Sequence, residues 1–98
     1  MVPINGTIDL GLPPFIERTL EEAKKQKASA VVFDINTFGG RVDAATQIKD
    51  AILSSDITTI AFINRRAISA GALISLSCEK IYMTGGALIG AATAVDMS

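Results

Sequence analysis

Residues 28–40 read A-S-A-V-V-F-D-I-N-T-F-G-G, a nearly continuous apolar run that ends in two glycines. An apolar run of this kind, over residues 28–35, is typical of an inner strand of a parallel sheet. Residues 36–40 are expected to form a loop, and the apolar stripe along residues 43–53 predicts the helix after it. This stretch therefore predicts a strand, a glycine-bearing loop and a helix in succession.

The same alternation of strand and helix continues on both sides of this stretch. Residues 2–10 alternate with a period of two, which indicates a strand, and a segment with apolar residues at helical spacing begins near Pro13. Three further elements are expected: a strand over residues 58–63, a short buried helix over residues 69–77 and a short strand over residues 80–83. The order β-α-β-α-β-α-β predicts an α/β fold with a mainly parallel sheet of β-α-β units and flanking helices.

Length and composition indicate one small domain over residues 1–98. Apolar residues make up 49% of the chain, and the mean hydropathy of +0.41 is high for a soluble domain. This excess of apolar residues is expected to lie either on inner strands covered on both faces, or on an apolar surface that a partner or further chain would hide. No terminating helix or polar tail follows residue 87, so we expect the domain to be truncated at its C-terminus.

The charges and the single cysteine argue against several classes of function. Nine basic and ten acidic residues give a net charge of −1, which provides no basic face for nucleic acid. Cys78 is alone, so it is expected to be a small buried hydrophobe rather than part of a disulfide or metal site. Neither a cofactor nor a metal is expected. The chain itself is predicted to be soluble, because it shows no signal peptide and its longest uncharged run, residues 81–95, is short and contains glycines.

The first motif is T-F-G-G, residues 37–40, at the end of the predicted inner strand. Glycines here let backbone N–H groups point into a cleft with no side chain in the way, and ligands of α/β sheets bind at the carboxyl ends of strands. A phosphate loop is disfavoured, because neither G-x-G-x-x-G nor G-x-x-x-x-G-K-[ST] is present. The alternative is a tight turn between strand and helix that carries no chemistry.

The second motif is A-I-S-A-G, residues 67–71. Ser69 would stand at a helix N-terminus, where the N–H of Ala70 could face a developing oxyanion. The alternative is that Ser69 caps the helix. The motif differs from the G-x-S-x-G turn of serine hydrolases, because Ala67 replaces its first glycine. The chain contains no histidine, so a catalytic Ser69 would need a base other than imidazole.

The two motifs are more informative together than apart. Gly40 and Ser69 are 29 residues apart, and each follows a predicted inner strand. Adjacent parallel strands joined by one helix bring such ends side by side. The backbone N–H groups of Gly40 and Ala70 and the hydroxyl of Ser69 could then act on one carbonyl group, as a two-donor oxyanion hole and a nucleophile.

Three blocks of the sequence carry a resemblance to a known family. They read D-I-N-T-F-G-G-R-V-D-A-A-T-Q-I, R-A-I-S-A-G-A-L-I-S-L-S and I-Y-M-T-G-G-A-L-I-G-A-A. In this order they resemble the serine-protease domain of the NfeD (nodulation formation efficiency D) membrane-associated proteases, in the ClpP/crotonase fold group. The resemblance covers essentially the whole chain. It implies that Ser69 is the catalytic nucleophile and that Gly40 and Ala70 supply the oxyanion-hole amides.

The resemblance also implies a Ser-Lys dyad, whose lysine follows the I-G-A-A segment in the family. The matching position lies beyond Ser98, so the base is not found in this chain. Lys49 and Lys80 are expected to be solvated rather than catalytic. Two positions differ from the family's pattern, because Phe38 replaces a proline and Gly85 stands where a proline is frequent. Phe38 is expected to pack into the substrate cleft or an interface.

This resemblance implies a serine endopeptidase domain that cleaves a hydrophobic segment of a membrane protein such as a stomatin homologue. It also implies a homo-oligomer and a membrane-associated parent protein. Two alternatives stay open: an inactive fragment or assembly module of the same fold, and a crotonase-like acyl-CoA enzyme. The acyl-CoA enzyme shares the oxyanion hole of two amides, but it does not need a serine at position 69.

Overall fold

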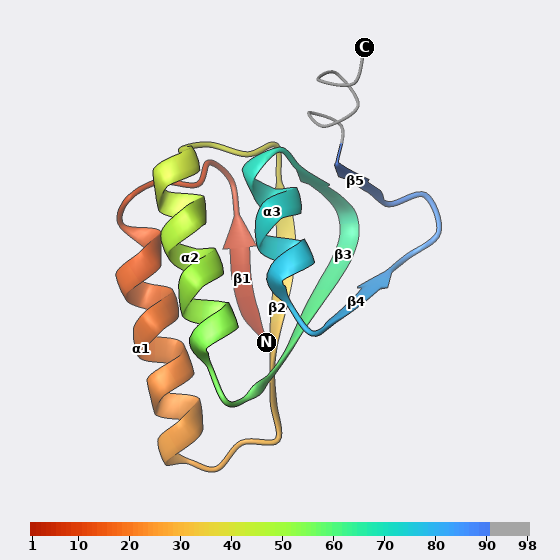
Figure 1. The fold of residues 1–98 in the computed structure, drawn as a ribbon. Coiled ribbons are helices and arrows are strands. Elements are labelled where there is room, and N and C mark those ends of the chain that lie inside the picture. The colour runs from red at the N-terminus through yellow and green to blue at the C-terminus, as the bar shows by residue number, and fades with distance from the viewer. Residues whose placement is uncertain (91–98) are drawn as a thin grey trace.

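The computed structural model describes residues 1–90, which form a parallel sheet with three helices (Figure 1). The strands are β1 (Val2–Asn5), β2 (Ala30–Thr37), β3 (Thr58–Ile68), β4 (Lys80–Met83) and β5 (Leu88–Gly90). The helices are α1 (Leu12–Lys25), α2 (Val42–Ser54) and α3 (Ala70–Ser77). Strand and helix alternate up to β4, so the predicted α/β class and the order of elements are confirmed.

The strands follow one another across the sheet in the order β1-β2-β3-β4, and every pair is parallel. β3 is long enough to have two partners along one edge. Its residues 60–63 pair with β4, and its residues 66–68 pair with β5. All of the strands therefore end at the same edge of the sheet, where the two predicted motifs lie.

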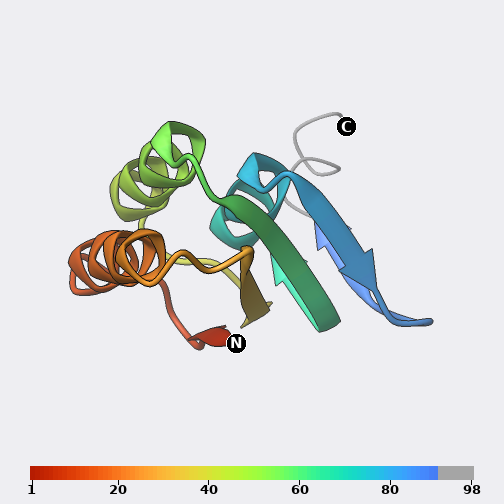
Figure 2. The ribbon, with the colours of Figure 1, turned by 90° about the horizontal axis from the view of Figure 1, so that it is seen from below.

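The three helices lie together on one face of the sheet (Figure 2). Strand β2 shows the consequence, because Val31, Phe33 and Ile35 are buried whereas the residues between them are half-buried. The expectation of inner strands covered on both faces is therefore wrong for residues 1–90. Right-handed crossovers that proceed in one direction across a sheet place every helix on the same side. Half-buried apolar residues on the other face, such as Ile60 and Phe62, account for part of the high hydropathy.

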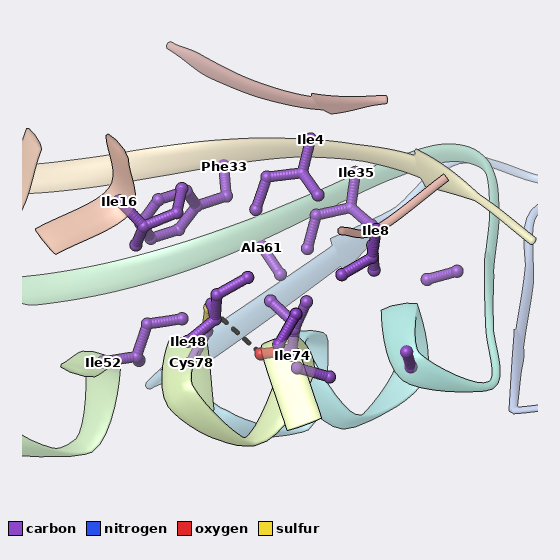
Figure 3. Packing of buried hydrophobic residues seen from close by; sticks show 14 of the residues in the cluster. Ile4, Ile8, Ile16, Phe33, Ile35, Ile48, Ile52, Ala61, Ile74 and Cys78 are labelled. Carbon is purple, nitrogen blue, oxygen red and sulfur yellow. Dashed lines mark hydrogen bonds between the residues drawn. The ribbon is translucent and has the colours of Figure 1, made fainter. Parts of the chain in front are cut away.

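The core lies between the sheet and the helices (Figure 3). Phe33 of β2, Ile16 of α1, Ile48 of α2 and Ile74 of α3 are each 0% exposed. Ile4 of β1 joins them with 1% exposure. Each fully buried aliphatic or aromatic side chain contributes roughly 1.5–3 kcal/mol relative to an exposed one. This cluster fixes how β2 and β3 stand relative to α3, and so fixes the site at the ends of these strands.

The boundaries of the strands differ from the sequence expectations in three places. Strand β2 begins and ends two residues later than residues 28–35. Strand β3 continues five residues past position 63, because its last part pairs with β5, and the polar run N-R-R at residues 64–66 hid this continuation. Strand β1 ends at Asn5, since Gly6 turns the chain with a φ of 72°. The helix bounds agree with expectation to within about one residue.

Within residues 1–90, no helix is long and apolar enough to cross a membrane. The longest helix, α1, has 14 residues and a charged outer face. A bilayer-spanning helix needs about 20 predominantly apolar residues.

Cys78 is buried at the end of α3, as predicted. Its side chain is 8% exposed, and its Sγ lies 3.7 Å from the carbonyl oxygen of Ile74 (Figure 3). Burial raises the pKa of the Cys78 thiol to about 11, although a hydrogen bond with Thr59 opposes this rise. The thiol therefore stays protonated at neutral pH and behaves as part of the core.

We expect Cys78 in the folded protein to react with iodoacetamide at least about 100-fold more slowly than in the unfolded chain. The raised pKa leaves little of the reactive thiolate at about pH 8, and burial limits access to it. A time course of alkylation, followed by mass spectrometry with and without urea, measures the ratio. Equal rates in the two conditions would show that the thiol is exposed.

Candidate functional site

The two motifs leave the sheet side by side at its carboxyl edge. Thr37 at the end of β2 is in register with Ala67 near the end of β3. The backbone of Gly39 then lies against the start of α3. A Cβ added at Gly39 would stand 3.0 Å from the Cβ of Ser69 and 3.4 Å from the amide nitrogen of Ala70. The structure therefore brings the glycine loop, Ser69 and Ala70 together, as the spacing of the motifs led us to expect.

Ser69 has an unusual backbone conformation between β3 and α3. Its φ of 55° and ψ of −117° lie outside the helical and extended regions. Residues other than glycine adopt positive φ at a cost of order 1–3 kcal/mol, and such residues cluster at functional sites. The same kind of strained turn between strand and helix exposes the nucleophile of α/β hydrolases. This turn places the serine side chain at the very end of the strand.

The alternative role of Ser69 as a side-chain cap does not match this geometry. Ser69 occupies the N-cap position of α3, but its hydroxyl makes no cap hydrogen bond. A capping serine has an extended backbone that turns its oxygen toward the free N–H groups of the first turn. The positive φ of Ser69 turns the side chain elsewhere. The hydroxyl is thus left available for another partner.

Two backbone N–H groups at this edge are available as donors. Neither Gly40 nor Ala70 donates a hydrogen bond to any group within residues 1–90. The loop is held from its other side, where Ile8 donates to the carbonyl of Gly39 at 3.0 Å and accepts from the N–H of Arg41 at 2.9 Å. In such a parallel bridge, the N–H of the middle residue, Gly40, points away from Ile8. The N–H of Ala70 is free because Ala70 begins a helix.

The two glycines of the loop fill different needs. A Cβ at Gly40 would collide with the carbonyl oxygen of Ile8 and stand 2.6 Å from its nitrogen. A Cβ at Gly39 would press on Ser69 and occupy the space before the amide of Ala70. Gly40 therefore permits the close approach of the segment around Ile8, and Gly39 keeps the site open.

Thr37 is a residue of the site that the sequence analysis did not single out. It is 2% exposed and holds three segments together. Its hydroxyl donates to the carbonyl of Gly6 and accepts from the N–H of Gly39 at 3.0 Å. Its methyl group fills the place where a Cβ of Gly71 would lie. The sequence offered one signal for this contact: a small polar residue, Thr37, shortly before the two glycines, and a glycine, Gly71, two positions after Ser69. That these two residues touch depends on the fold.

We expect Gly71→Ala to destabilise the protein by about 1–3 kcal/mol, because the new methyl group overlaps the Cγ2 atom of Thr37. Thr37→Ser removes that methyl group and keeps the hydroxyl that holds Gly39. The double variant should therefore recover most of the loss caused by Gly71→Ala. Urea unfolding of the four proteins of this cycle measures the coupling.

A matched control for this cycle is Gly85→Ala. Nothing lies within 4 Å of a Cβ placed at Gly85, and its φ is not positive. This substitution should change the free energy of unfolding by less than about 0.5 kcal/mol. Additive effects of Gly71→Ala and Thr37→Ser would contradict the proposed packing of the threonine against α3.

The lysines that the sequence analysis considered lie away from Ser69. Lys49 is in α2 and forms an ion pair with Asp50 at 3.4 Å. Lys80 begins β4, in register with Ile60 of β3. Because the strands are parallel, Lys80 stands toward the amino edge of the sheet, whereas Ser69 follows the carboxyl edge. The expectation that neither lysine serves as the base agrees with these positions.

Within residues 1–90, no group of three or more His, Cys, Asp or Glu side chains is placed to bind a metal ion. A hollow of about 630 Å³ lies between α1 and the amino end of β2, lined by residues such as Phe15, Ala23 and Val31. This hollow includes none of the predicted site residues. The groups proposed for chemistry, Ser69 and the amides of Gly40 and Ala70, therefore lie outside this hollow, at the carboxyl edge of the sheet.

The sequence matches the family model described as NfeD1b, N-terminal domain, over residues 1–98. Over 96 residues it is 42% identical to the membrane protein NfeD1b of Bacillus subtilis. The matched region covers 98% of this chain and 22% of that protein. The chain therefore spans about a fifth of the length of this relative.

Many solved structures have a similar fold, among them the following two. One is a mutant of 1510-N, a membrane-bound stomatin-specific protease of Pyrococcus horikoshii, in complex with a substrate peptide. It is 30% identical, with a TM-score of 0.83 over 89% of this chain and 42% of that chain. The other is a mutant of ClpP1 from Listeria monocytogenes, 28% identical with a TM-score of 0.75 over 80% of this chain and 46% of that chain. The fold is therefore ClpP-like, as the sequence predicted.

Proposed function

The chain belongs to the NfeD1b N-terminal domain family, and we propose that it is the nucleophile-bearing part of a serine endopeptidase. The observation that carries the proposal is the strained backbone of Ser69, next to two N–H groups without partners within residues 1–90. A helix cap or a plain turn needs neither feature. The similarity to 1510-N supports a peptidase at the level of the family.

The proposed reaction is acyl transfer through Ser69. The Oγ atom attacks the carbonyl carbon of the scissile peptide bond and loses its proton to a base. The oxygen of the tetrahedral intermediate accepts hydrogen bonds from the N–H groups of Gly40 and Ala70. The proton passes to the amine, which leaves as the C–N bond breaks, and water then hydrolyses the acyl-enzyme. Removal of one such oxyanion donor typically lowers kcat by about 10²–10³-fold.

The base in this proposal is a lysine supplied from outside residues 1–98. A serine hydroxyl is a weak nucleophile without a base beside it. A lysine can serve only in its neutral form, so its pKa must be lowered by an apolar setting. Lys49 is engaged with Asp50, and Lys80 lies toward the far edge of the sheet, so neither offers such a setting beside Ser69.

The proposed substrate is a hydrophobic segment of a membrane protein such as a stomatin homologue. The specificity of 1510-N for stomatin and its complex with a substrate peptide support this choice of substrate class. Apolar side chains also flank the glycine loop, since Phe38 is 74% exposed and Val42 is 67% exposed. We also propose a homo-oligomer and membrane association of the full-length protein, as the resemblance implied.

Two other functions compete with the peptidase. An inactive assembly module would keep the fold but would not need the strained backbone at Ser69. A crotonase-like acyl-CoA enzyme would use the two amides without the serine. Binding of acyl-CoA by the full-length protein would favour that second alternative.

A fluorophosphonate probe tests the proposed function. The full-length protein should be labelled on Ser69, as mapped by mass spectrometry of the proteolysed adduct. Labelling should fall when the probe competes with a hydrophobic peptide derived from a stomatin homologue. Absence of labelling on Ser69, in a folded preparation, would favour the inactive module instead.

A further inference from the structure

A second, smaller hollow borders the glycine loop. It has a volume of about 260 Å³, large enough for one or two side chains. Its lining residues come from the turn after β1, the end of β2, the glycine loop and the second half of β3, and they include Gly6, Asn36, Thr37, Phe38, Gly39 and Arg66. Gly39 also lies against Ser69, so the hollow and the proposed nucleophile both border the glycine loop. We therefore expect a peptide that is bound for cleavage at Ser69 to pass beside this hollow.

Arg66 is held in place at this hollow by two contacts. Its guanidinium carbon lies 4.4 Å from the centre of the Phe38 ring. One of its terminal nitrogens donates to the Oδ1 atom of Asn36 at 3.2 Å. Stacking on an aromatic ring uses none of the N–H donors of a guanidinium, and one hydrogen bond uses one of five. The half-buried side chain of Arg66 is therefore oriented, and most of its donors are left over.

The charge of Arg66 has no counterpart within the described part of the chain. The ion pairs within residues 1–90 join Lys24 to Asp56, Arg41 to Asp43 and Lys49 to Asp50. None of the residues that line the hollow is acidic, and Arg66 is the single charged one among them. A half-buried cation is stabilised by an anionic partner, and the planar fork of a guanidinium matches a carboxylate in particular.

We propose that this hollow is a subsite that binds a carboxylate of the peptide substrate, with Arg66 as its recognition residue. The carboxylate is either the side chain of an aspartate or glutamate near the scissile bond, or the C-terminus of the peptide. The inference rests on the proposed peptidase function, and it adds an acidic determinant to a substrate that is otherwise apolar. Phe38 forms one wall of the subsite and orients Arg66.

Binding to the full-length Ser69→Ala variant tests this subsite without requiring catalysis. Fluorescence anisotropy gives the Kd of labelled hydrophobic peptides that contain Glu or Gln at successive positions, each with a free or an amidated C-terminus. We expect the peptide with the matching carboxylate to bind about tenfold more tightly than its neutral counterpart. The preference should weaken at high salt, because the pair is only half-buried. The two sets of peptides show whether the carboxylate belongs to a side chain or to the C-terminus.

Arg66→Gln should abolish the preference, and Arg66→Lys should retain part of it, because lysine keeps the charge but not the fork. Arg65→Gln is the matched control. It removes the same charge from the neighbouring, exposed residue, which does not line the hollow. The proposal would be overturned by equal Kd values for acidic and neutral peptides, or by an equal loss of preference in the Arg65 and Arg66 variants. A carboxylate preference without any hydrolysis by the unmodified enzyme would keep the subsite and reject the peptidase.

Discussion

Ser69→Ala in the full-length protein is expected to lower the cleavage of a hydrophobic peptide by at least about 10³-fold. The substitution removes the oxygen that forms the acyl-enzyme, and no other hydroxyl of α3 can replace it. Ser75 is 0% exposed and donates to the carbonyl of Gly71 at 2.8 Å. Ser77 lies at the other end of the helix. The rate of release of a fluorescent fragment from a labelled peptide measures the loss.

The control for this prediction is Ser77→Ala. Ser77 is in the same helix, and its hydroxyl donates to the carbonyl of Leu73 at 2.7 Å. Loss of that bond should cost about 1 kcal/mol or less of stability and leave kcat/KM within a few-fold of its original value. Ser69→Ala should keep the fold. The substitution hardly changes the backbone strain at position 69, because alanine disfavours a positive φ as serine does. Unchanged cleavage by Ser69→Ala would remove the catalytic role of this residue.

Gly40→Ala is expected to lower kcat by about 10²-fold or more. A Cβ at this position would collide with the backbone of Ile8, so the loop must move away from the turn after β1. That movement displaces the N–H group proposed to hold the oxyanion. It should also destabilise the protein by roughly 1–3 kcal/mol through overpacking. Peptide cleavage at saturating substrate, together with urea unfolding, measures the two effects separately.

Gly85→Ala provides the comparison for Gly40→Ala, because its new methyl group meets nothing within 4 Å. It should leave both kcat and the unfolding midpoint unchanged. The activity of Gly40→Ala is measured under conditions in which circular dichroism shows that the variant is folded. A loss of activity is then due to the displaced loop rather than to unfolding. A folded Gly40→Ala variant that cleaves at the original rate would contradict the assignment of its N–H group.

The sequence predicted the order of the elements and the parallel sheet, because each segment carries its own periodicity. The features that it missed arise from contacts between distant segments. Strand β3 runs to Ile68 because β5 pairs with its second half, although N-R-R at residues 64–66 looks like a loop. The placement of all helices on one face follows from the order of strands in the sheet. That order cannot be read from local patterns alone.

The candidate site was predicted in the same partial way. The sequence singled out Ser69, Gly40 and Ala70, and the structure brings Ser69 and Ala70 together with the loop that contains Gly40. The role of Thr37 was missed, since its partners Gly6 and Gly71 are remote in the chain. The choice between a cap and a nucleophile also needed the backbone angles of Ser69. A sequence motif gives the residue types but not the direction in which a hydroxyl points.

The most direct measurement is a crystal structure of the full-length protein after reaction with a fluorophosphonate. We expect a covalent bond between the Oγ atom of Ser69 and phosphorus. We also expect a phosphoryl oxygen at about 2.7–3.1 Å from the amide nitrogens of both Gly40 and Ala70. An unmodified Ser69, or a phosphoryl oxygen that contacts neither amide, would contradict the central claim that these residues form the catalytic site.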